Sequence, residues 1–409
     1  MLKLPVLVSL PDALSSLVPP DAERKPYPSW FEPVFYLSCA AVLLQTSRLV
    51  RVSWYLGVML PLATQMLQYT KGSHIENYIA GLTIPASLVR VLDLALCHEP
   101  QREFWKIRGG TSKKEDKSMA WPQGVFARAR WAFELLVSSR AIGWNIQAKN
   151  VPKVPKQGYG KFHFLCKRLT ESIISFLIVD GVTYYRRTVV APMVQSQTFW
   201  DIPLEYQILI SWLSGYQVYN LLNMQYNLAA TGTTVLGICE LDDWPPLFGS
   251  FLPSNLWSVR RLWGSAWHQM MRRACNFSGG LACDLTRAKR GTLRRRYIDL
   301  YAAFGFSAVI HTVGSLCLRS EEHAFYQGVF YVMQPFMITL EDFVIYLGKS
   351  VGMQQNRLTG YVGFAFVCVW ISFCFRYMAA AETACGWNLE NPLPFSVAAQ
   401  LHRYYQALH

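Results

Sequence analysis

Long apolar runs separated by charged links dominate the chain. A membrane-spanning helix needs about 20 mostly apolar residues. Eight segments approach this pattern, and they are residues 31–47, 52–69, 77–97, 163–186, 205–228 (or on to 239), 301–318, 324–348 and 361–381. The fourth is weakest at its start, where Lys167, Arg168 and Glu171 indicate entry from an interface. The pattern predicts an all-α polytopic membrane protein with about eight transmembrane helices.

Two long polar regions interrupt the apolar runs, and both are basic. Residues 98–162 hold 13 Lys and Arg against 5 Asp and Glu, and residues 241–300 hold 10 against 4. Two predicted spans separate them, so both lie on one side of the membrane. Because cytosolic loops collect Lys and Arg, we expect both loops in the cytosol and the N-terminus in the lumen. The basic links 48–51 and 349–357 and the acidic link 320–322 fit this topology.

The basic loops also carry aromatic residues that favour a membrane interface. Their tryptophans are Trp105, Trp121, Trp131, Trp144, Trp257, Trp263 and Trp267. Residues 124–139 and 254–275 are predicted to form amphipathic interfacial helices on the cytosolic leaflet. Residues 1–20, which contain prolines and no clear cleavage site, are predicted to be a mature N-terminus or an interfacial segment.

The predicted organisation is one membrane-embedded catalytic unit built from consecutive parts. They are residues 1–97 with the first three spans, 98–162 as the first basic loop, 163–240 with two spans, 241–300 as the second loop, and 301–409 with the last three spans and a C-terminal tail.

Composition agrees with a membrane protein. Hydrophobic residues make up 52% of the 409 residues and charged residues 16%, against about 25% charged in soluble domains. The net charge of +13 would indicate a nucleic-acid partner in a soluble protein, but here the basic loops account for it. The ten cysteines are scattered without a C-x-x-C pair, so there is no zinc or disulfide pattern and we expect no metal site. We also expect no permanently bound cofactor and no nucleic-acid partner.

His311 is the first candidate for chemistry. It lies ten residues into the apolar span 301–318, where an imidazole must still find hydrogen bonds. Ser307 and Ser315 lie four residues before and after it on the same helix face, with Gly314 nearby. This small, polar face could line a substrate cavity, or His311 could be a packing residue bonded to a neighbouring helix.

His268 is the second candidate. Trp263 and Trp267 are four residues apart, as on one helical face, and basic pairs at 260–261 and 272–273 flank them. Such an aromatic and basic segment could bind anionic lipid headgroups, or it could hold the phosphates of coenzyme A.

The remaining ionisable residues are less informative. His74, His98, His323 and His409 fall at predicted loops or ends, where a solvated side chain is the simplest interpretation. The intramembrane carboxylates are Asp180, Glu341 and Asp342. Such groups usually face a protein interior or water.

Five motifs in order resemble a known family. They are SRAIGW at 139–144, WPPLFG at 244–249, LWGSAWHQ at 262–269, FSAVIH at 306–311, and QP at 334–335 followed by ED at 341–342. They are similar to signatures of the fungal wax-synthase-like acyltransferases, relatives of the membrane-bound O-acyltransferases, and they cover about 130–385. The chain departs from the family at Leu262, where many relatives have Phe, at Ser265 and Ala266, which are often basic or bulky, and at Ala141, which is usually Gly.

The resemblance implies acyl transfer from acyl-CoA to an alcohol. It implies His311 as the general base and His268 as a second catalytic residue near the thioester carbonyl. Acyl-CoA would be guided by Trp263, Trp267, Arg260, Arg261, Arg140 and Trp144. The substrate cavity would include Ser307, Gly314, Ser315, Gln334, Glu341 and Asp342, although Glu341 and Asp342 could equally be a structural pair.

Fungal relatives of this type often acetylate terpenoid or meroterpenoid hydroxyls, so the resemblance favours acetyl-CoA as co-substrate, a lipophilic alcohol as acceptor and the endoplasmic reticulum as location. A long-chain wax or sterol ester synthase is the alternative enzyme. A small-molecule transporter, using the intramembrane carboxylates along a pathway, is the non-enzymatic alternative.

Overall fold

The computed structural model describes residues 17–107, 121–152, 160–195 and 197–408. Most of the predicted N-terminal interfacial segment, and parts of the first basic loop, lie outside these residues. The chain forms two compact units, which we describe separately. Unit 1 comprises residues 1–147 and 271–332, and unit 2 comprises residues 148–270 and 333–409.

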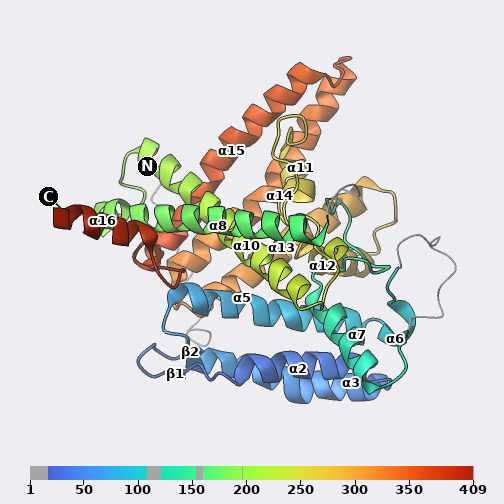
Figure 1. Ribbon diagram of the computed structural model, residues 1–409. Helices are drawn as coiled ribbons and strands as arrows, with labels where there is room; N and C mark the ends of the chain where they lie inside the picture. The colour runs from blue at the N-terminus through green and yellow to red at the C-terminus, as the bar shows by residue number, and fades with distance from the viewer. Residues whose placement is uncertain (1–16, 108–120, 153–159, 196, 409) are drawn as a thin grey trace. The chain divides into compact units, whose positions relative to one another are not determined.

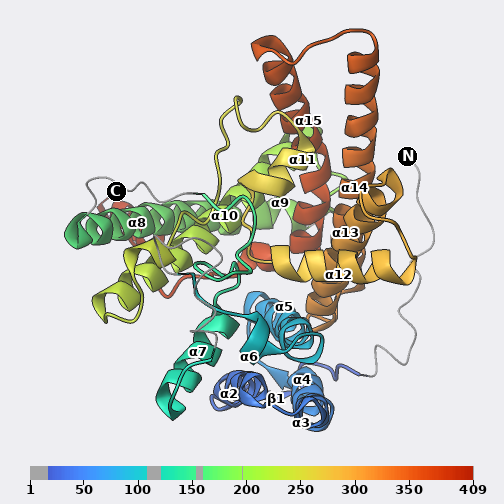
Figure 2. The same ribbon diagram turned by 90° about the vertical axis from the view of Figure 1, so that its right-hand side faces the viewer.

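Unit 1 is built from helices and one very short parallel strand pair. Its elements are β1 (Lys25–Pro26), α2 (Phe31–Leu44), α3 (Arg48–Trp54), η1 (Tyr55–Met59), α4 (Leu60–Gln65), η2 (Met66–Gln68), β2 (Tyr69–Thr70), α5 (His74–Val91), η3 (Leu92–Leu96), α6 (Pro100–Glu103), α7 (Val125–Val137), α12 (Arg272–Leu285) and α13 (Leu293–Leu316). In the strand pair, Lys25 is opposite Tyr69 and Pro26 is opposite Thr70. Helix α5 lies between α2 and α13 (Figure 2).

Unit 2 is also helical. Its elements are α8 (Lys161–Tyr185), η5 (Arg186–Val190), α9 (Ala191–Gln195), α10 (Leu204–Val235), η6 (Leu241–Asp243), α11 (Val259–Arg261), η7 (Leu262–Ala266), α15 (Arg357–Ala384), η8 (Trp387–Leu389) and α16 (Val397–Leu408). Helices α8 and α10 run side by side (Figures 1 and 2), and α10 also packs on α15. Helix α14 (Glu321–Ser350) begins in unit 1 and ends in unit 2.

Helices occupy all eight positions where the apolar pattern predicts them. Within the described residues, three are long and apolar enough to cross a membrane, and these are His74–Leu96, Glu321–Ser350 and Arg357–Ala384. The first predicted span is only a 14-residue helix, Phe31–Leu44, about 21 Å long, which is shorter than the apolar core of a bilayer. The chain is therefore mostly helical, and its described part contains three candidate spans.

Of the two segments predicted to be amphipathic helices, the first forms a helix and the second does so only in part. Helix α7 falls within the predicted segment 124–139. Within 254–275, however, the helix formed by α11 and η7 ends at Ala266, and Trp267 has an extended backbone. The expectation that Trp263 and Trp267 share one helical face is therefore wrong, although their rings pack at 6.2 Å.

The motif at 139–144 forms a tight turn in unit 1. Ala141 has a φ of 50° and Gly143 a φ of 73°, both in the left-handed region where glycine is favoured. A non-glycine residue there costs about 1 kcal/mol. This backbone explains why the resembling family usually has glycine at the position of Ala141.

Helices α5 and α13 approach closely where two glycines meet. A Cβ atom on Gly81 would lie 2.8 Å from the Cα of Gly314 and 2.8 Å from Cys317 Sγ. A Cβ atom on Gly314 would lie 2.9 Å from two ring carbons of Tyr78. Only residues without a side chain fit these positions, so the two glycines set the distance between the helices.

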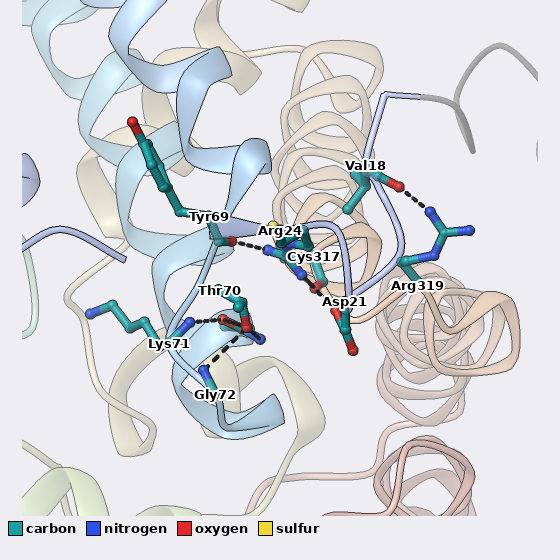
Figure 3. Close-up of polar contacts among 10 residues, drawn as sticks. Val18, Asp21, Arg24, Tyr69, Thr70, Lys71, Gly72, Cys317 and Arg319 are labelled. Atoms are coloured by element: carbon teal, nitrogen blue, oxygen red, sulfur yellow. Dashed lines mark hydrogen bonds and ion pairs between the residues drawn. The ribbon is translucent and has the colours of Figure 1, made fainter. Parts of the chain in front are cut away.

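Arg24 and Arg319 hold the end of α13 against the start of the described chain through hydrogen bonds to backbone carbonyls (Figure 3). Arg24 is buried, and it donates to the carbonyls of Cys317, at 2.9 Å, and of Tyr69. Arg319 donates to the carbonyl of Val18. Because the last carbonyls of a helix lack partners within the helix, the cation of Arg24 stabilises the C-terminal end of α13.

Unit 2 contains a buried ionic network. Arg186 donates to Glu382 at 2.7 Å, to Gln217 at 2.6 Å and to Asn388 at 2.7 Å. All four side chains are buried. The network joins α10, α15 and η8 to η5, which continues α8. Removing one member would leave a buried charge or polar group of the network without its partner.

We predict that Gly81→Ala destabilises the protein, because the added methyl group overlaps Gly314 and Cys317. Overpacking of this kind typically costs about 1–3 kcal/mol. The matched control is Gly305→Ala in α13, where nothing lies within 4 Å of the added atom. Thermal unfolding in detergent should show a lower midpoint for Gly81→Ala only, and equal midpoints for both variants would contradict the close contact.

Candidate functional site

The site in unit 1 centres on His311 in α13. Its Nδ1 lies 2.5 Å from the hydroxyl oxygen of Tyr78 in α5. The ring of Tyr331, in α14, stacks on the imidazole at 4.1 Å with an interplanar angle of 25°. One nitrogen of His311 is thus engaged and one face of its ring is covered, and the residue as a whole is half-buried.

A second histidine lies beside this group. His323 is fully buried, and the prediction that it is solvated is wrong. Its Nδ1 lies 2.7 Å from the hydroxyl of Ser315, which also donates to the carbonyl of His311 at 2.9 Å. Because the hydroxyl has one proton, His323 must donate to Ser315 through Nδ1–H. The ring of Tyr78 packs edge-on against His323 at 5.2 Å.

The other residues predicted for the cavity near His311 have packing partners. Gly314 faces the ring of Tyr78. Ser307 donates to the carbonyl of Ala303 at 3.3 Å, and its hydroxyl lies 3.7 Å from the thiol of Cys275 in α12. The small face of α13 is thus used at least partly for helix packing. Sequence reasoning missed Tyr78, whose contact with His311 joins positions 233 residues apart.

Helix α13 is also strongly polarised along its length. Its first turn carries Arg294, Arg295 and Arg296, whereas His311 lies five residues before its end at Leu316. Arg295 pairs with Asp284 at 3.2 Å, and Arg294 and Arg296 are exposed. The basic end of the helix and the histidine are therefore well separated.

In unit 2 the two aromatic motifs of the second loop meet. The amide of Gly249 donates to the carbonyl of Ala266 at 2.8 Å, and a Cβ on Gly249 would lie 2.2 Å from the carbonyl oxygen of Ser265. Phe248 packs against Trp267 at 5.1 Å and His268 at 6.1 Å. The WPPLFG motif thus supports the segment that carries His268.

A buried glutamine in α14 holds the tryptophan of the same segment. The side-chain oxygen of Gln334 accepts from the indole N–H of Trp263 and from that of Trp370, both at 3.1 Å. Gln334 is fully buried, so its role in this structure is to fix Trp263 next to α15.

The carboxylates of α14 anchor the start of the α11–η7 helix. Glu341 accepts from the backbone amides of Val259 at 2.7 Å and Arg260 at 3.1 Å. Asp342 binds the guanidinium of Arg260 through both oxygens, at 3.1 and 2.5 Å. Because the first amides of a helix lack partners within it, these contacts make Glu341 and Asp342 structural anchors.

The other residues predicted to contact acyl-CoA are Arg261, Arg140 and Trp144, and they differ in their burial. Arg261 lies over the ring of Trp257, 5.2 Å from its centroid. Arg140 and Trp144, in contrast, are buried in unit 1, and Trp144 packs against Trp131 at 5.8 Å. Their burial fits support of the turn at 139–144 rather than contact with a ligand.

Two further charged residues have structural partners. Arg273 binds Asp93 at 2.5 Å in unit 1, and the same carboxylate lies 3.3 Å from His98. The hydrogen bond to Asp93 raises the pKa of His98. In unit 2, Asp180 accepts from the backbone amide of Ala398 at 2.8 Å, at the start of α16. Among the described residues, no three His, Cys, Asp or Glu side chains gather as metal ligands would.

The structure therefore gathers the predicted residues into two groups. His311, Ser307, Gly314 and Ser315 lie in unit 1, as do Arg140 and Trp144. His268, Trp263, Trp267, Arg260, Arg261, Gln334, Glu341 and Asp342 lie in unit 2.

Comparisons with known proteins agree with the motifs. Residues 244–333 match the membrane bound O-acyl transferase family. This stretch contains the WPPLFG and LWGSAWHQ motifs and the whole of α13 with His311. No solved structure matches the chain.

Curated relatives extend the similarity over most of the chain. The acetyltransferase sirH of Leptosphaeria maculans is 28% identical over 352 residues, which cover 80% of this chain and 83% of the relative. The acetyltransferase ple2 of Rhodocybe pseudopiperita is 25% identical and covers 86% of this chain and 89% of the relative. The O-mevalon transferase macI of Penicillium terrestre is 24% identical and covers 77% and 75%. The motif match and these relatives together show that the chain is an acyltransferase similar to the membrane bound O-acyl transferase family.

Proposed function

We propose that the protein transfers an acetyl group from acetyl-CoA to a hydroxyl of a lipophilic secondary metabolite of the terpenoid or meroterpenoid type, with His311 as the general base. The observation that carries this proposal is the placement of His311, a half-buried residue in an apolar helix with one ring nitrogen bonded to Tyr78. The names of relatives such as sirH and ple2 support acetyl as the acyl group.

The proposed reaction is a single transfer without an acyl-enzyme. His311 accepts the hydroxyl proton as the alcohol oxygen attacks the thioester carbonyl. The carbon–sulfur bond then breaks, and the proton returns from the imidazolium to the coenzyme A sulfur. His268 is proposed to donate to the carbonyl oxygen as negative charge develops there. This role for His268 rests on the resemblance of the LWGSAWHQ motif.

The described contacts refine which residues would guide acyl-CoA. Arg261, Trp263 and Trp267 are half-buried, so parts of their side chains are accessible. Arg260 is held by Asp342, and Arg140 and Trp144 are buried. Arg260 is nevertheless half-buried like Arg261. We therefore propose that Arg260, Arg261, Trp263 and Trp267 contact the donor and that Arg140 and Trp144 support the loops. Glu341 and Gln334 hold the same segment in place.

We further propose a location in the endoplasmic reticulum membrane with the N-terminus in the lumen, about eight spans, and the basic loops in the cytosol, where acyl-CoA is made available to the enzyme. The charge asymmetry of the loops supports this topology.

A transporter is the less favoured reading because the intramembrane carboxylates are already engaged. Asp180 accepts the amide of Ala398, Glu341 accepts two amides, and Asp342 pairs with Arg260. Carboxylates that bind a transported ion would instead need to exchange partners during the cycle.

The substrate class can be tested with membranes that contain the protein. Incubation with labelled acetyl-CoA and a panel of lipophilic terpenoid alcohols should give an acetyl ester, detected by mass spectrometry. Palmitoyl-CoA should be a much poorer donor. Faster transfer from palmitoyl-CoA would indicate a wax or sterol ester synthase, and uptake of the alcohols without ester formation would indicate a transporter.

We predict that His311→Ala lowers kcat by about 10²–10⁴-fold, because the alcohol loses its proton acceptor. The purified variant should still elute as a folded protein, and loss of the bond to Tyr78 and of the stacking on Tyr331 should lower its thermal midpoint. Wild-type turnover by the folded variant would disprove the assignment. His268→Ala should also reduce turnover severely in the same assay.

Removing the helix anchor should affect stability first. Glu341→Ala leaves the amides of Val259 and Arg260 without their acceptor, which we expect to cost about 1–3 kcal/mol. Glu341→Gln, which keeps one acceptor oxygen, should retain part of this stability. Glu205→Ala, at an exposed position in α10, is the matched control. Equal thermal midpoints for Glu341→Ala and Glu205→Ala would contradict the anchoring role.

A further inference from the structure

We propose that Tyr78 is a positioning residue that fixes which ring nitrogen of His311 faces the substrate. The inference rests on the proposed role of His311 as the base. It concerns a residue from a different helix, α5, that belongs to none of the five motifs.

The contacts of His311 leave it one orientation. The hydroxyl oxygen of Tyr78 is hydrogen-bonded to Nδ1 of His311, with 2.5 Å between the two atoms. The stacked ring of Tyr331 covers one face of the imidazole. A flip of the ring would break the first contact. Nε2 is therefore the nitrogen that acts on the alcohol.

The chemistry then sets the tautomer. In a neutral imidazole one nitrogen carries a proton and the other accepts. For Nε2 to accept the proton of the alcohol, Nδ1 must be protonated and must donate to Tyr78 Oη. When Nε2 takes the proton, the ring becomes an imidazolium, and the bond from Nδ1–H to Tyr78 becomes charge-assisted and stronger. Tyr78 thus stabilises the charged form without exchanging a proton itself.

Neighbouring residues hold Tyr78 where it can do this. The ring carbons Cδ2 and Cε2 of Tyr78 lie against Gly314, where a Cβ atom would be only 2.9 Å away. His323 packs edge-on against the same ring at 5.2 Å, and Ser315 binds both His323 and the carbonyl of His311. The absence of a side chain at Gly314 therefore leaves room for the ring of Tyr78, whose hydroxyl bonds to His311.

The test is Tyr78→Phe, which keeps the ring and its packing and removes only the hydroxyl. We expect kcat to fall about 10- to 100-fold, as for other partners that orient a functional histidine, while the KM values for acetyl-CoA and the alcohol stay within about twofold. The matched control is Tyr55→Phe, which removes a hydroxyl that also bonds to α5, through the carbonyl of Leu88 at 3.4 Å. This control should keep the wild-type kcat.

A second measurement avoids any dependence on folding. Replacing Tyr78 with fluorotyrosine and difluorotyrosine keeps its shape but makes Oη a weaker acceptor. If Tyr78 accepts from Nδ1–H, kcat should decrease with each added fluorine, whereas a purely structural tyrosine would not respond. Wild-type kcat in Tyr78→Phe and in both fluorinated proteins would overturn the inference.

The two hypotheses can fail separately. Turnover by a folded His311→Ala variant would refute the proposed base, whatever Tyr78 does. An inactive His311→Ala variant combined with unchanged kcat in Tyr78→Phe would leave the base in place and refute the role of Tyr78.

Discussion

Polar side chains buried among apolar helices must find hydrogen-bond partners, and both units are organised by this requirement. An unpaired buried polar group costs about 1–3 kcal/mol. In unit 1, the two terminal nitrogens of Arg24 donate to backbone carbonyls, and the hydroxyl of Tyr78 bonds to His311. In unit 2, Arg186 is satisfied by Glu382, Gln217 and Asn388. Each of these bonds joins elements distant in sequence, so satisfying the polar groups also fixes which helices pack together.

The need for hydrogen-bond partners also bears on the small, polar face of α13. A small, polar helix face can admit a ligand or another helix, and the sequence does not distinguish the two. The structure shows Gly314 used for close contact with Tyr78, while Ser315 bonds to His311 and His323. This packing is compatible with the proposed chemistry, because Tyr78, which packs against Gly314, also bonds to His311.

Helix positions could be predicted from the sequence because apolar runs are a local property. The partners of individual residues could not. His323 lies two residues into α14 after an acidic link, so its sequence surroundings indicate solvent, and only the approach of α5 and α13 shows that it is buried. Trp267 was misplaced because helical spacing does not reveal that the helix ends at Ala266. The sequence leaves open whether Glu341 and Asp342 line a cavity or support the fold, and it does not show their bonds to residues 259 and 260, which support a structural role.

The polarity of α13 has a consequence for the charges around the reacting group. Fifteen residues separate Arg296 from His311, which corresponds to about 22 Å along a helix. The arginines of the first turn therefore cannot touch a group that reacts at the imidazole. Exposed charges act over about 8 Å at physiological salt, so these arginines can attract an anion to their end of the helix without acting on the bond that changes at the other end.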